Sequence, residues 1–103
     1  MKRKIQIEFK GEIHEVIPSF AVMERIEQRF TLLDFARGVS VMNPKFSDVA
    51  WVLYSCLVEN GIKVTHDDVG EYVMDERSKA TESATEIIAT MLDSGPEKVS
   101  KKK

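Results

Sequence analysis

The sequence FSDVAWVLYSCLVENG, residues 46–61, decides the fold of this chain. Ser47 can cap a helix by accepting a hydrogen bond from a free N–H of the first turn, and Asp48 places a carboxylate at the positive end of the helix dipole. Gly61 can take the left-handed conformation that closes a helix. The residues between them are almost all apolar, a pattern typical of a helix that neighbours cover on several sides. We therefore predict a central helix over Ser47–Asn60.

The chain has 103 residues, enough for one domain with a single modest core. Its composition, 43% apolar and 31% charged, is that of a globular protein rather than a disordered one. We predict a compact domain over residues 1–95 and a disordered, lysine-rich tail over residues 96–103. No run approaches the ~18 apolar residues of a membrane span, and the basic start lacks the apolar run of a signal peptide. We therefore expect a cytoplasmic protein with no membrane partner.

An N-terminal β-hairpin precedes the central helix. Apolar and polar residues alternate over residues 5–9, which is the period of a half-buried strand, and Lys10-Gly11 marks the tip. We predict a three-residue loop that pairs Phe9 with Ile13, because this register places the apolar residues of both strands on one face. His14 then points to solvent. The outer edges of the hairpin either accept a strand from a partner or are covered by other parts of the same domain.

Four to five helices are expected after the hairpin, which gives an α+β fold packed around the Ser47–Asn60 helix. Apolar stripes at helical spacing predict one helix over Phe20–Arg29, capped by Ser19. A second short helix is predicted over Leu32–Ala36, and Gly38 is predicted to end it.

Two further helices follow the central one. A capping-box pattern begins a short helix at Thr65. The segment Asp75–Lys79 is a polar break before the last helix, which has a clean amphipathic stripe. The last helix begins at either Ser78 or Ser83 and is stopped at Gly95.

Acidic residues gather in the C-terminal half of the chain. Residues 65–97 carry nine acidic and two basic side chains, whereas the whole chain has a net charge of −2. Such a segment either faces a basic partner or is a solvated polar surface. The candidate protein-binding residues are the acidic ones of the short helix and the polar break: Asp67, Asp68, Glu71, Asp75 and Glu76.

No catalytic or cofactor-binding signature is found in the sequence. The five glycines are scattered rather than grouped in a phosphate loop. The chain has only two histidines, and neither forms a plausible catalytic set with an acid and a serine or cysteine. His66 beside Asp67 and Asp68 has no second ligand cluster to complete a metal site. Cys56, inside the central helix, is expected to behave as a small hydrophobe. We therefore predict that the protein is not an enzyme, has no cofactor or metal, and acts by binding other proteins.

Nucleic acid is not an expected partner. A nucleic-acid interface requires a basic stripe with exposed aromatic side chains. The basic residues of this chain are spread out, and we expect these aromatic side chains in the core: Phe20, Phe30, Phe35, Trp51 and Tyr54.

The order of the segments resembles that of the small tail assembly chaperones of long-tailed phages, prophages and gene transfer agents, some of which are labelled tail tube proteins. After the hairpin IQIEFKGEIHEVI comes FAVMERIEQRF, which is similar to the family pattern F-[GA]-x-[LM]-x-x-[IL]-E. Later comes THDDVGEYV, which is similar to T-x-[DE]-[DE]-V. The matching residues are Phe20, Ala21, Met23, Ile26 and Glu27, and then Thr65, Asp67, Asp68 and Val69.

The resemblance implies a protein that binds the tape measure protein, and also tail tube subunits, during tail assembly. It implies that the protein keeps aggregation-prone helical segments soluble in the cytoplasm of the bacterial host and is absent from the mature virion. A homo-oligomer is compatible with this function. The alternative is a small phage-encoded regulatory or antitoxin-like protein that binds one target or nucleic acid.

Overall fold

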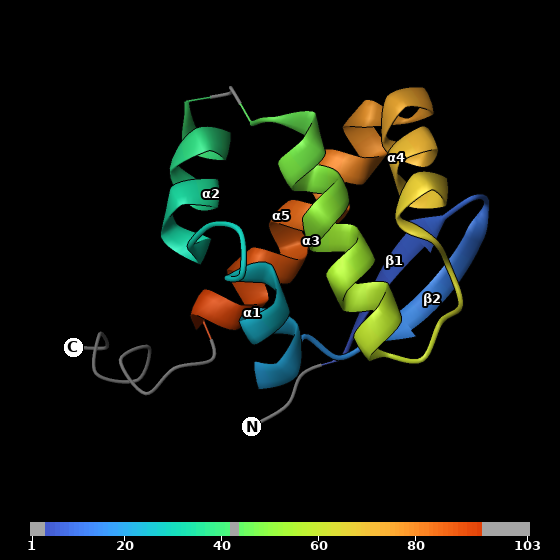
Figure 1. Ribbon diagram of the computed structural model, residues 1–103, viewed down its shortest axis with the longest axis horizontal. Helices are drawn as coiled ribbons and strands as arrows, with labels where there is room; N and C mark the ends of the chain where they lie inside the picture. The colour runs from blue at the N-terminus through green and yellow to red at the C-terminus, as the bar shows by residue number, and fades with distance from the viewer. Residues whose placement is uncertain (1–3, 42–43, 94–103) are drawn as a thin grey trace.

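The structure, a computed structural model, describes residues 4–41 and 44–93. Within these residues an antiparallel two-stranded hairpin is followed by five helices, so the predicted α+β fold is confirmed (Figure 1). The elements are β1 (Ile5–Phe9), β2 (Glu12–Val16), α1 (Phe20–Ile26), α2 (Leu32–Ser40), α3 (Phe46–Glu59), α4 (His66–Asp75) and α5 (Arg77–Asp93). The predicted stop at Gly95 and the tail over residues 96–103 lie outside the described residues.

The predicted register of the hairpin is wrong. Lys10 and Gly11 form a two-residue turn in which both have positive φ, +54° and +80°, the conformation of the tight turn that matches the twist of paired strands. Phe9 therefore pairs with Glu12, and Ile5 pairs with Val16. The turn geometry sets the register. In this register Ile13 lies on the outer face of the hairpin and is 63% exposed.

The observed register also moves His14 onto the inner face of the hairpin, opposite Ile7. Its ring is half-buried and lies 6.5 Å from the ring of Phe9, so the prediction that it points to solvent is wrong. On β1, the backbone groups of Glu8 face away from β2, because opposed residues alternate between paired and outward-facing backbone groups. The Tyr72 hydroxyl donates to the Glu8 carbonyl at 3.0 Å. Helix α4, which carries Tyr72, therefore covers the β1 edge at Glu8.

The central helix α3 begins one residue earlier than predicted. Lys45 is its N-cap and makes no side-chain hydrogen bond, so the predicted cap at Ser47 is wrong. At the other end Gly61 has a φ of +82°. The Gly61 N–H donates to the Val58 carbonyl and the Ile62 N–H to the Leu57 carbonyl, both at 3.0 Å. These two bonds satisfy carbonyls that the end of a helix leaves free, so the predicted closure at Gly61 is confirmed.

The two helices before α3 differ in length from the predictions. Ser19 caps α1 as predicted, but the helix ends at Ile26 rather than Arg29. The second helix, α2, runs through Gly38 to Ser40, so the predicted end at Gly38 is wrong. Phe20, predicted in the core, is 66% exposed.

The polar break before the last helix shrinks to one residue. Thr65 and Asp68 form the predicted capping box at the start of α4. Glu76 alone separates α4 from α5, and Arg77 begins α5, so the predicted starts at Ser78 and Ser83 are both wrong. The hydrogen bond from the Ala80 N–H to the Glu76 carbonyl, at 2.9 Å, continues the helical pattern through this segment.

Two helices share the centre of the fold. Helix α3 packs against α1, α4 and α5, and its buried side chains lie on several sides, as predicted. Helix α5 packs against α2, α3, α4 and β1, and it crosses behind α3 in Figure 1. The core therefore lies between α3 and α5, with the hairpin beside α4 at one end and α2 at the other (Figure 1). Within the described residues no helix combines the length and apolar character needed to cross a membrane.

Candidate functional site

The five predicted acidic residues lie on α4 or directly after it, and the structure divides them. Asp68 is engaged in the capping box and lies 3.9 Å from the Lys10 ammonium. Glu71, Asp75 and Glu76 line a cavity of about 480 Å³ between α4, the hairpin tip and the first turn of α5. Asp67 is exposed and does not line this cavity.

The cavity beside α4 is mixed in charge rather than purely acidic. Lys10 and Lys79 line it together with four carboxylates, the three above and that of Glu8. Lys79 lies 3.5 Å from the Glu8 carboxylate. Burial, and then the charges of Glu8 and Glu76, raise the pKa of the Tyr72 hydroxyl on its wall. Lysines therefore neutralise part of the acidic surface that the sequence indicates.

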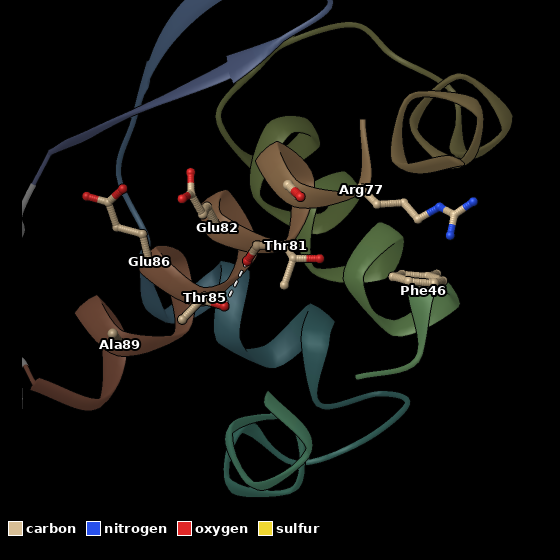
Figure 2. Close-up of a pocket in the computed structure, with 8 residues that line it drawn as sticks. Phe46, Arg77, Thr81, Glu82, Thr85, Glu86 and Ala89 are labelled. Atoms are coloured by element: carbon tan, nitrogen blue, oxygen red, sulfur yellow. Dashed lines mark hydrogen bonds between the residues drawn. The ribbon is translucent and has the colours of Figure 1, made fainter. Parts of the chain in front are cut away.

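A second, open groove of about 620 Å³ lies along α5 (Figure 2). Small residues of α5 form its floor: Ser78, Thr81, Thr85 and Ala89. The Thr85 hydroxyl donates to the Thr81 carbonyl at 2.7 Å, so it adds no unpaired donor to the floor. Because these side chains are short, another chain can approach the helix backbone closely.

The two sides of this groove differ in chemistry. Glu82 and Glu86 extend to the same side of α5, and Phe46 and Arg77 lie on the other side (Figure 2). Phe46, at the start of α3, is 45% exposed. The Arg77 guanidinium lies 5.4 Å from the centre of the Phe46 ring, a cation–π distance. One flank is therefore anionic, and the other is formed by an aromatic ring held by an arginine.

An apolar cavity of about 230 Å³ adjoins the groove between α2 and α5. Thr85 and Ala89 line both spaces. The other residues around the cavity are Phe35, Ala36, Val39, Ser40, Ile88 and Leu92. The groove and the cavity therefore adjoin along α5, and we call the two together the α5 groove.

Trp51 belongs to the interior rather than to a binding surface. It is 8% exposed, and its indole N–H lies 3.1 Å from the Arg25 carbonyl and 3.2 Å from the Ile26 carbonyl at the end of α1. The Arg29 guanidinium covers its ring at 4.1 Å from the centroid. The exposed His66 ring lies edge-on to Trp51 at 5.8 Å. These contacts assign His66 to an aromatic cluster.

Cys56 lies fully buried in α3, and burial raises the pKa of its thiol to about 12. Only the thiolate is a nucleophile or a metal ligand, so this thiol is chemically inert at neutral pH.

Within the part of the chain that the structure describes, no group of three or more His, Cys, Asp or Glu side chains could hold a metal ion.

Sequence reasoning missed the α5 groove. Its signal was present as small residues at positions 78, 81, 85 and 89, on the side of the helix away from the buried stripe. The apolar wall could not be inferred, because Phe46 and Val39 come from helices far away in the sequence.

Comparison of the chain with models of protein families, with curated proteins and with solved structures found no match.

Proposed function

We propose that this protein is a tail assembly chaperone of the phage or prophage type, which binds the tape measure protein, and also tail tube subunits, during tail morphogenesis. It acts in the cytoplasm of the bacterial host and is absent from the mature virion. The protein does no chemistry and carries no cofactor. Its task is to cover apolar helical segments of its client until assembly buries them.

The observation that carries this proposal is the α5 groove. Its floor of short side chains, Thr81, Thr85 and Ala89, lies between an anionic flank and an apolar wall. Amphipathic helices bind proteins by laying their apolar face into a groove of this kind. A tape measure protein is a long helical protein, so such a groove suits segments of it.

A second observation supports protein binding over nucleic-acid binding. Among the described residues, five of the nine lysines and arginines lie within ion-pair distance of a carboxylate. Two more, Arg29 and Arg77, cover aromatic rings. Of the described cationic side chains, only Lys45 and Lys63 are therefore left to follow a phosphate backbone, which an interface with nucleic acid requires.

The test is co-expression and pull-down of the full chain with the products of the genes that flank its own. Capture of a very long helical tape measure protein, with more of that protein in the soluble fraction than without the chaperone, is the expected result. A matched control is an unrelated acidic protein of similar size, which should not change the solubility. Capture of DNA or of one small partner, with no effect on a tape measure protein, would replace the proposal with the regulatory alternative.

A further inference from the structure

We propose that the α5 groove binds one amphipathic helix that carries lysines or arginines along a single flank and one large apolar anchor residue. This inference rests on the proposed function, because the helix is a segment of the client. It adds where on the chaperone that segment lies and what sequence pattern the client segment must have.

The dimensions of the groove fit a helix of about four turns. The lining residues of α5 run from Arg77 to Leu92 without a gap, because Thr85 and Ala89 border both the groove and the apolar cavity. At 1.5 Å per residue this face is about 22 Å long. A client segment of about 15 residues therefore covers it.

The apolar cavity fixes the position of the anchor residue. Its volume of about 230 Å³ is below that of ordinary small-molecule sites, which begin at roughly 300 Å³. Phe35, Val39, Ile88 and Leu92 provide apolar walls. A leucine, methionine or phenylalanine of the client suits this space, and deeply buried anchors of this kind dominate the affinity of protein interfaces.

The carboxylates on the flank select a basic client. Glu82 and Glu86 are both exposed and lie one helical turn apart, and neither is within ion-pair distance of a cation in the described residues. The acidic residues near the hairpin tip differ in this respect, because Lys10 and Lys79 already lie beside them. Among the described residues, the opposite wall, with Arg77 on Phe46, holds no carboxylate. Cations are therefore favoured on one flank of the client helix only.

Charge also argues against a second copy of this chain as the occupant. In an antiparallel pair of α5 helices, the two-fold axis places Glu82 and Glu86 of both copies on the same flank. Four carboxylates then lie close together, and like charges across an interface oppose binding. A basic helix from another protein meets no such repulsion.

The probe is an 18-residue fluorescein-labelled peptide whose leucines form one apolar stripe and whose lysines follow one flank of that stripe. Its acidic twin has glutamate in place of each lysine. Fluorescence anisotropy with the full chain should show binding of the basic peptide, with the acidic twin weaker by at least about tenfold. Binding should weaken from 0.1 M to 0.5 M NaCl, because salt screens the exposed charges. Equal binding of both peptides would overturn the inference.

Two variants locate the site. Ala89→Trp fills the junction of the groove and the cavity, and Glu82→Lys/Glu86→Lys reverses the charge of the flank; each should weaken the basic peptide by at least about tenfold. The matched controls are Ala21→Trp, at an exposed alanine on α1, and Glu12→Lys/Glu24→Lys, the same charge change at exposed positions elsewhere. Both controls should bind the peptide as the wild type does. Loss of binding in Asp67→Lys/Glu71→Lys alone would move the site to α4 and overturn the inference.

The same variants separate this inference from the proposed function. If the tape measure protein is captured equally by the wild type and by Ala89→Trp, the function stands and the α5 groove is not its site. If the basic peptide binds the groove while no tape measure protein is captured, the groove is a docking site and the tail-assembly role fails. A dimer by light scattering that Ala89→Trp abolishes would identify a second copy as the occupant, against the inference.

Discussion

The side-chain amide of Asn60 pairs with both backbone polar groups of Ile17. Its Oδ1 accepts from the Ile17 N–H at 2.9 Å, and its Nδ2 donates to the Ile17 carbonyl at 3.1 Å. Nδ2 also donates to the Cys56 carbonyl at 2.8 Å. Ile17 directly follows β2 and Asn60 is the C-cap of α3, so one side chain joins the hairpin to the central helix.

Asn60→Ala should lower the free energy of unfolding by about 2–3 kcal/mol. It removes hydrogen bonds worth about 1 kcal/mol each and leaves the polar groups of Ile17 without their partner. Urea denaturation followed by circular dichroism measures the change. Gln28→Ala, at an exposed position of the turn after α1, is the control and should change stability by at most about 0.5 kcal/mol. Equal effects of the two substitutions would contradict the assigned role of Asn60.

Trp51→Ala should lower the free energy of unfolding by about 3–5 kcal/mol, because it removes a large buried ring. Arg29→Ala only uncovers that ring, so it should lower the free energy of unfolding by about 0.5–1 kcal/mol. Thermal unfolding by circular dichroism compares both variants with the wild type. An unchanged melting temperature for Trp51→Ala would contradict the assignment of the indole to the core.

Two glycines should respond to alanine in opposite directions. Gly70 lies inside α4 with nothing within 4 Å of an added Cβ, so Gly70→Ala should stabilise the protein by up to about 1 kcal/mol through helix propensity. Gly61 has a φ of +82°, so Gly61→Ala should destabilise it by about 1–2 kcal/mol. Chemical denaturation of both variants provides the comparison, and a stabilising Gly61→Ala would contradict the observed helix end.

Cys56 should make stability fall at high pH. Its pKa is about 12 in the folded protein against 9.0 for the free thiol, so the unfolded chain loses this proton first. The thiol's contribution to the free energy of unfolding is complete below pH 9. Above pH 9 it declines by about 1.4 kcal/mol per pH unit. Cys56→Ala, which lacks the titrating group, is the control. The stability difference between wild type and Cys56→Ala should shrink from pH 8.5 to pH 10.5, and a constant difference would exclude a raised pKa.

Ser55→Ala should leave stability unchanged or raise it by about 1 kcal/mol. The Ser55 side chain is fully buried, and its hydroxyl has no hydrogen-bond partner among the described residues. Removing a buried, unsatisfied polar group removes its desolvation cost. Differential scanning calorimetry measures the shift. The nearby Cys56→Ser adds a hydroxyl at another fully buried position and should destabilise the protein.

Much of the fold could be predicted because its signals are local. The capping box at Thr65 and the closing turn at Gly61 are confirmed, since each depends on residues within one turn of the chain. The register of the hairpin was predicted wrongly, because matching the apolar faces was weighted above the geometry of the Lys10-Gly11 turn. The turn prevails because two residues with positive φ leave the strands one pairing.

The candidate site could be predicted in part. The sequence located the acidic residues from Asp67 to Glu76, but it could not show that Lys10, from the hairpin tip, would lie 3.9 Å from Asp68. The α5 groove was not predicted, because its walls come from α2 and α3 and its floor from α5. The small outward residues of α5 indicate the floor, but no single helix carries a signature of the walls.

The sequence by itself determined the elements of this protein: a hairpin, an apolar central helix, and an amphipathic last helix with a buried stripe and small outward residues. Caps, turns and periodicity act over a few residues, so they can be read along the chain. Only the tertiary structure decided that α5 shares the centre with α3, that Phe46 lies beside Arg77, and that a groove and an apolar cavity adjoin at Thr85. These features depend on how residues far apart in the chain pack together, and packing is a property of the whole core.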